Sequence, residues 1–302
     1  MSWRFQGSAA AWGLWLALGG AGCEDQRFVI GMFAPGQGGG GAAGAPERPT
    51  FEPPAAVTEL NSDAREEDPT LTGDLLEIYF MSDRGGDRDI WRSRRASPGS
   101  PWDAPQAVEA LNSAEIEDTP SVSEDGLRIW FFSAREPAGV RLAERASRDD
   151  PWGAPVHVAA LDVPETEVMS PHVDPTELRV AVGLRGPSTA GWDIAIATRE
   201  RPEDGWGALA PLAELNGPDD DHAPFLFDDG RQILFRSGGD LLWARRPAAD
   251  AAFEAAEPLT APLNLPDARD TDPHLSPDGA VLFFASTRTG VADIYEARRL
   301  AP

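Results

Sequence analysis

The residues best suited to chemistry are acidic side chains ahead of five recurring prolines, Pro69, Pro120, Pro171, Pro224 and Pro273. If the fold gathers these acids on one face, they could bind a basic partner or a cation, and Ca²⁺ would need about six to eight oxygen ligands. The alternative is that they are solvated, turn-favouring carboxylates that keep the protein soluble. The acids predicted to line a binding face are Glu67, Asp68, Glu117, Asp118, Glu167, Asp220, Asp221, Asp270 and Asp272.

Histidines could add metal ligands to this set. His172 and His274 directly follow their prolines, and His222 lies two residues before Pro224. Two imidazoles and a nearby carboxylate can hold a transition metal. The slot after the proline contains other residue types in the remaining copies, however, which is typical of a tolerant packing position. We therefore predict no metal site and no cofactor.

The elements that must position these residues form a repeat. The five prolines fall 51, 51, 53 and 49 residues apart, and an apolar alternating run follows each of them. A repeat of about 50 residues built from short alternating strands is typical of a β-propeller blade. The sequence therefore predicts an all-β protein, a five-bladed β-propeller.

Each copy predicts an innermost strand that starts at its proline, because proline at a strand start costs no ladder hydrogen bond. Asp-Gly pairs such as Asp125-Gly126 then predict tight hairpin turns, since both residue types tolerate a positive φ. The predicted inner strands are residues 69–72, 120–123, 171–174, 224–227 and 273–276.

The two ends of the repeat complete each other. Residues 51–61 align without a gap on residues 102–112, at an offset of 51, and so form a surplus copy of the outer strand. The last copy stops at residues 300–302, before a fourth strand. We expect the N-terminal strand to complete the last blade, which closes the ring and removes exposed sheet edges.

Two sets of recurring side chains are predicted to be structural. Arg84 with Asp89, and Arg288 with Asp293, flank a hairpin and should be hydrogen-bonded partners. The outer strands carry tryptophans that we expect to anchor blade packing rather than to stack on sugars. These are Trp102, Trp152 and Trp206.

The last copy resembles the TolB-like β-propeller repeat. Residues 275–288 carry a Ser-Pro-Asp-Gly turn, an aliphatic and aromatic strand and a Ser-x-Arg triplet, and Asp293-Ile294-Tyr295 follows. Copies three and four match the repeat less well, and Gly238-Gly239 replaces Ser-x-Arg in copy four. The resemblance covers about residues 51–300 and implies a binding platform in the periplasm or at the cell surface. It bears on fold more than on function, since superfolds host many activities.

Catalytic motifs are absent from the sequence. There is no Gly-x-Ser-x-Gly, no His-Glu-x-x-His and no phosphate-cradling glycine loop. Five-bladed glycoside hydrolases place a few unlike carboxylates at the channel. The acids here recur in every copy, as a scaffold would require, so we predict no catalytic residue and no enzyme.

Net charge and cysteine content exclude one class of partner and one kind of cross-link. The formal net charge is −24, and such an acidic chain repels phosphate backbones, so nucleic acid is disfavoured. Cys23 is the only cysteine, which means that the fold uses no disulfide.

The N-terminal residues predict where the protein is located in the cell. Residues 1–22 contain an apolar core of about ten residues, which suits a signal peptide and is too short to span a bilayer. Cys23 directly follows small residues and resembles a lipobox cysteine, so we predict lipidation; an ordinary signal peptide with a free thiol is the alternative. Residues 23–50 are rich in Gly, Ala and Pro and predict a flexible linker, and residues 51–302 form the propeller.

Together these features predict a monomeric, lipid-anchored propeller of the cell envelope, on the periplasmic or surface side of the outer membrane. It would act as a non-catalytic module that binds an envelope protein or another ligand at the channel face. The alternative is a glycan-binding or glycoside-hydrolase-like propeller.

Overall fold

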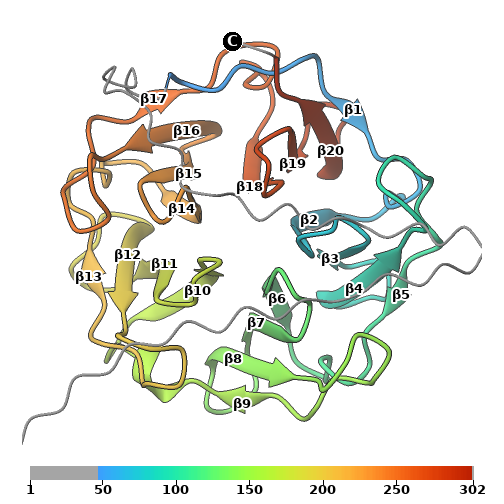
Figure 1. Ribbon diagram of the computed structural model, residues 1–302, viewed down its shortest axis with the longest axis horizontal. Coiled ribbons are helices and arrows are strands. Elements are labelled where there is room, and N and C mark those ends of the chain that lie inside the picture. The colour runs from blue at the N-terminus through green and yellow to red at the C-terminus, as the bar shows by residue number, and fades with distance from the viewer. Residues whose placement is uncertain (1–46, 301–302) are drawn as a thin grey trace, which may run out of the picture. The chain divides into compact units, whose positions relative to one another are not determined.

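The computed structural model describes residues 47–300, which form five four-stranded antiparallel sheets arranged as blades around one axis (Figure 1). The predicted five-bladed propeller is confirmed. Cys23 and the predicted signal peptide lie outside the described residues. Among residues 47–300 there is no helix long and apolar enough to cross a membrane.

Each blade runs outward from an inner strand. Blade one contains β2 (Glu66–Leu71), β3 (Glu77–Ser82), β4 (Asp89–Arg94) and β5 (Gln106–Ala107). Blade two contains β6 (Glu117–Val122), β7 (Arg128–Ser133), β8 (Gly139–Glu144) and β9 (Val156–His157). A 3-10 turn, η1 (Ala159–Leu161), leads to blade three, with β10 (Glu167–Val173), β11 (Arg179–Arg185), β12 (Asp193–Thr198) and β13 (Ala210–Pro211). Blade four contains β14 (Asp221–Phe227), β15 (Gln232–Ser237), β16 (Asp240–Arg245) and β17 (Glu257–Pro258).

Blade five is completed from the other end of the chain. Its strands β18 (Asp270–Leu275), β19 (Val281–Ser286) and β20 (Asp293–Arg298) are joined by β1 (Ala55–Ala56), which pairs antiparallel with β20. The Asn61 side chain both accepts the Ile294 N–H (2.8 Å) and donates to the Ile294 carbonyl (3.0 Å). The predicted closure is therefore confirmed, and every blade has its fourth strand.

The Leu-Asn corner that recurs in the sequence has a structural cause. In four blades an asparagine side chain bonds the backbone N–H and carbonyl of the second residue in the third strand, as Asn61 does with Ile294. The preceding leucine, such as Leu60, is fully buried. The other three clamps are Asn112 on Ile90, Asn216 on Ile194 and Asn264 on Leu241.

The hydrophobic core lies between neighbouring blades. Phe80 of blade one and Phe283 of blade five are buried in one cluster with Trp102, which is 7% exposed. Trp102, Trp152 and Trp206 each receive an arginine guanidinium on the ring, at 4.2, 4.3 and 4.0 Å. The predicted role of these tryptophans in blade packing is confirmed.

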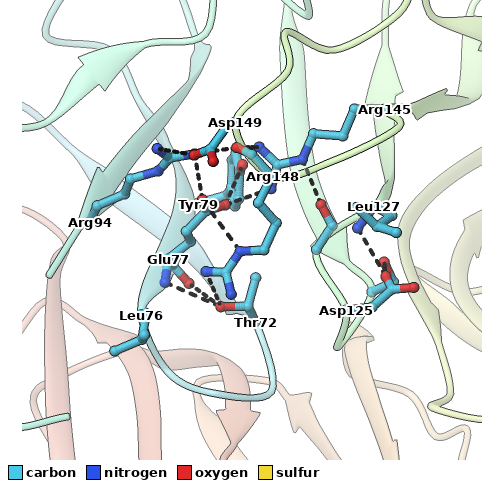
Figure 2. A network of polar contacts seen from close by, with 12 residues as sticks. Thr72, Leu76, Glu77, Tyr79, Arg94, Asp125, Leu127, Arg145, Arg148 and Asp149 are labelled. Carbon is cyan, nitrogen blue, oxygen red and sulfur yellow. Dashed lines mark hydrogen bonds and ion pairs between the residues drawn. The ribbon is translucent and has the colours of Figure 1, made fainter. Parts of the chain in front are cut away.

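A buried polar network joins blades one and two (Figure 2). The Glu77 carboxylate pairs with Arg145 of blade two and with Arg94, each at 2.6 Å, and accepts the Tyr79 hydroxyl at 3.0 Å. Burial by itself raises the pKa of Glu77, but the hydrogen bond and charge of Arg145, together with Arg94, lower it overall. The tight turn beside this network needs glycine, because a Cβ on Gly126 (φ +72°) would meet Thr72 Cγ2 at 2.9 Å.

The inner strands begin earlier than predicted. β2 starts at Glu66 rather than at Pro69, and the other four inner strands likewise include the residues before the proline. In each, the ladder shifts register just before the proline, and the residue ahead of the proline has a left-handed φ between 50° and 57°. Because a β-bulge leaves residues unpaired, it tolerates a proline inside the strand.

The predicted Arg84–Asp89 pair is wrong. Arg84 instead pairs with Glu66 at 2.9 Å and donates to the Leu60 carbonyl, while one Asp89 oxygen has no partner among the described residues. Arg288 likewise pairs with Asp270 at 2.7 Å rather than with Asp293. The arginine reaches across the hairpin to a buried acid, where its charge is needed, rather than along the strand connection.

Candidate functional site

Position relative to the proline divides the predicted acids into three groups. Acids three residues before the proline are buried in four blades, and in three of these blades the acid pairs with an arginine across its hairpin. Three of them accept from the Ser-x-Arg arginine, and the fourth accepts a backbone N–H at 2.6 Å. The pairs are Glu66–Arg84 (2.9 Å), Glu117–Arg135 (3.1 Å), Asp270–Arg288 (2.7 Å) and Asp221 with Gly217. Glu117, Asp221 and Asp270 therefore belong to the scaffold.

Residues at the next two positions differ in chemistry from blade to blade. Except for Ala223, they line a cavity of about 230 Å³ enclosed by the inner strands, which we call the central pocket. Four of the nine predicted acids meet there: Glu67, Asp68, Asp118 and Asp272. The other lining residues are Thr119, Met169, Ser170, His222 and Thr271 of the inner strands, with Arg65, Arg88, Trp192, Arg236 and Arg269.

Three aspartates from three blades share the floor of this pocket. The Asp68 carboxyl is hydrogen-bonded to the side chains of Asp118 and Asp272, and its backbone N–H lies 3.4 Å from Asp272 Oδ2. Burial, followed by the negative charges of Asp272 and Asp118, raises the pKa of Asp68 well above its ordinary value. Burial also raises the pKa of Asp118, although Arg88 at 2.8 Å opposes this. Burial and the two neighbouring carboxylates therefore disfavour the charged form of Asp68.

Trp192 and His222 form one wall. Trp192 is half-buried, its backbone N–H donates to Asp220 Oδ1 at 3.1 Å, and its ring lies 5.8 Å from that of His222. Gly183 makes room for them, because a Cβ there would stand 3.1 Å from His222 Cβ and 3.4 Å from Trp192 Cε3. Burial, and then the charge of Arg236, lowers the pKa of His222 to about 4, so this imidazole is neutral.

Two predicted acids lie beside the pocket rather than in it. Asp220 is exposed and holds the Trp192 backbone, and Glu167 pairs with Arg185 at 2.7 Å. Arg185 in turn lies 4.6 Å from the Trp192 ring. Both acids thus support the wall that carries Trp192.

Trp192 and Arg236 are site residues that the sequence reasoning missed. Neither residue type recurs at its position in the other copies. Trp192 precedes the Asp-led third strand, where blades one, four and five have Arg88, Gly239 and Ala292. Aligning the copies on their prolines and looking for unlike residues would have pointed to them.

The histidines after the prolines line a second, smaller cavity that shares Asp68 and Asp272 with the central pocket. His172, Phe225 and His274 pack together there, with the Phe225 ring centroid 4.3 Å from that of His172 and 4.9 Å from that of His274. Burial lowers the pKa of His172 to about 4, and burial with the charge of His172 lowers that of His274 to about 3. Among the described residues, no three His, Cys, Asp or Glu side chains are grouped to hold a metal ion.

Comparison with known proteins gives the fold and no family. No family model matches the sequence, and no curated protein is significantly similar to it. An α-L-arabinofuranosidase from Podospora anserina, solved with cellotriose, is 9% identical with a TM-score of 0.58, covering 84% of this chain and 98% of that one. A family 117 glycoside hydrolase from Zobellia galactanivorans is 12% identical with a TM-score of 0.57, covering 83% and 90%. A structure described as TolB from Agrobacterium tumefaciens is 19% identical with a TM-score of 0.49, covering 76% and 72%.

The prediction that the chain is not an enzyme is wrong. That prediction rests on acids that recur in every blade, as in a non-catalytic scaffold, yet glycoside hydrolases are built on the same fold. The acids that recur are the scaffold acids such as Glu117, whereas Asp68, Asp118 and Asp272 form an unequal set at the channel.

Proposed function

We propose that the central pocket binds a glycan and that Asp68 acts as a general acid on its glycosidic bond. The observation that carries this proposal is the burial of Asp68 in contact with Asp272 and Asp118, which raises the pKa of Asp68 and favours its protonated form. Glycoside cleavage requires such a carboxylic acid to protonate the leaving oxygen.

The second carboxylate of this chemistry is assigned to Glu67. In glycoside hydrolases the two carboxyl groups stand about 5–9.5 Å apart, on either side of the scissile bond. Asp118 and Asp272 are hydrogen-bonded to Asp68 and are too close to it for that role, so they tune its pKa instead. Glu67 is the remaining acid of the pocket, and its carboxylate is ion-paired with Arg269.

Trp192 supplies a surface for a sugar ring. Ligand pockets combine aromatic side chains with a few placed polar groups, and Trp192 is the aromatic residue of the central pocket besides His222. The likeness to two glycoside hydrolases supports the proposal at the level of fold.

The test is binding and turnover by the purified full chain. An oligosaccharide array identifies ligands, and release of reducing ends from the bound glycans measures cleavage. Asp68→Asn should lower kcat/KM by about 10²–10⁴-fold, the usual contribution of general acid catalysis. Asp63→Asn, an exposed acid on the adjoining loop, is the matched control. Absence of glycan binding, or equal turnover by Asp68→Asn and wild type, would refute the proposal.

The cellular location is a separate proposal that rests on the sequence. We propose that residues 1–22 direct export and that Cys23 is lipidated, so that residues 23–50 tether the propeller to a membrane. In a detergent phase separation the full chain should enter the detergent phase and Cys23→Ser should not. Equal partitioning of the two proteins would contradict the anchor.

A further inference from the structure

One charged residue breaks the pattern of the inner hairpins. Arg236 lies on β15 directly opposite His222 of β14. The residues in the same ladder position of the other blades, opposite Glu67, Asp118, Met169 and Thr271, carry no charge. They are Met81, Phe132, Gly183 and Ala285. The hairpin therefore does not need an arginine here.

Arg236 also does not replace the missing scaffold arginine of blade four. In blades one, two and five that arginine pairs with the buried acid three residues before the proline. In blade four the acid is Asp221, which accepts from the Gly217 N–H and keeps one oxygen without a partner among the described residues. Arg236 makes no ion pair with it, so its charge serves another purpose.

The guanidinium of Arg236 is held in place by neutral groups. Its Nε donates to the Gly238 carbonyl at 2.7 Å, and its Nη1 donates to His222 Nε2, which can accept because the pKa of His222 is lowered to about 4. Within residues 47–300 no carboxylate forms an ion pair with Arg236. The other three arginines of the pocket each have one: Arg65 with Asp83, Arg88 with Asp118, and Arg269 with Glu67.

The formal charge of the pocket differs from that of the whole protein. Four arginines line the pocket against four acids, so its formal charges balance. The whole chain has a formal net charge of −24. A gathering of the minority charge, with an arginine that forms no ion pair among residues 47–300, is a feature of an anion site.

We infer that the bound sugar is acidic, and that Arg236 binds its anionic group, a uronic acid carboxylate or a sulfate ester. This inference rests on the proposed glycan site. A guanidinium offers planar, paired N–H donors that match such oxyanions, and it remains charged at any physiological pH. His222 and Gly238 hold the Arg236 guanidinium in place, and Trp192 lies beside His222, where it can contact the sugar ring.

The test compares acidic and neutral sugars on the full chain by titration calorimetry. The probes are tetrasaccharides of glucuronic, galacturonic and mannuronic acid, their carboxyl-reduced neutral forms, and sulfated derivatives of those neutral forms. Wild type should bind at least one acidic probe roughly 10- to 100-fold more tightly than its neutral counterpart, as expected for charge-assisted hydrogen bonds. A preference for the uronate or for the sulfated arm identifies which anion is recognised. Added salt should weaken binding of the acidic probe selectively.

Arg236→Met is the decisive variant, because blade one carries Met81 at this ladder position and the hairpin accepts it. It should lose the preference and bind acidic and neutral probes equally. Arg236→Lys should keep part of the preference. Arg201→Met, at an exposed loop, removes the same charge and should behave as wild type. Equal affinity of wild type for both probe classes, or an undiminished preference in Arg236→Met, overturns the inference alone; absence of any glycan binding overturns the proposed function with it.

Discussion

The buried network at Glu77 allows a stability prediction with a worked magnitude. Glu77 is 2% exposed, and the side chain of Arg145, with which it pairs across the boundary between blades one and two, is fully buried (Figure 2). Glu77→Gln keeps the shape but removes the charge, which leaves Arg145 buried beside a neutral amide. Breaking a buried ion pair in this way costs about 3–5 kcal/mol. At about 2–4 °C per kcal/mol for a domain of this size, Tm should fall by roughly 6–20 °C.

The control is Glu144→Gln, which removes an exposed partner of Arg128. Surface pairs contribute about 0–1 kcal/mol, so this variant should melt within a few degrees of wild type. Thermal unfolding followed by circular dichroism at neutral pH separates the two cases. If Glu77→Gln melts no lower than Glu144→Gln, the network does not join the blades energetically.

The same network fixes a sign for the pH dependence. The pKa of Glu77 is lowered in the folded protein relative to its ordinary value of 4.5. Its contribution to stability is therefore complete above about pH 4.5 and is lost as pH falls through the lowered folded pKa. Glu77→Gln should show a weaker loss of stability in acid than wild type. A parallel acid limb in both proteins would contradict this reasoning.

Three further predictions concern the ring and the pocket. Deleting residues 51–61 should remove the strand that completes blade five and lower Tm by many degrees; a truncated chain that melts like the intact one would contradict closure. Asp68→Asn should be more stable than wild type at neutral pH, because the raised folded pKa of Asp68 makes wild-type stability fall as pH rises above about 3.8. Urea unfolding between pH 4 and 8 measures this, and an equal dependence of the unfolding free energy on pH in both proteins would count against it. Gly183→Ala should weaken glycan binding about tenfold by displacing His222, while Tm stays near wild type, since Ala285 occupies the same ladder position; unchanged affinity would show that the wall tolerates the methyl group.

The fold could be predicted from the sequence because its determinants are local and recur. The spacing of the prolines gives the number of blades, and the Leu-Asn corner and Asp-Gly turn mark the same points in most of them. The inner-strand starts were missed because a β-bulge depends on cross-strand register, which periodicity within one strand does not reveal. Arg84 was assigned to Asp89, a neighbour in sequence, whereas its partner Glu66 lies across the hairpin.

The pocket was harder to predict because the same five segments supply both scaffold and site. Glu117 and Asp118 are adjacent acids, yet one locks a hairpin to Arg135 and the other borders Asp68. Composition cannot separate them, since a β-strand sends successive side chains to opposite sides. Comparison between copies can: a position that keeps its charge in several blades serves the hairpin that every blade shares, and a position that changes from Asp to His to Met serves something that only the whole ring possesses. By that criterion Arg236 belongs to the site, and no carboxylate of residues 47–300 forms an ion pair with it.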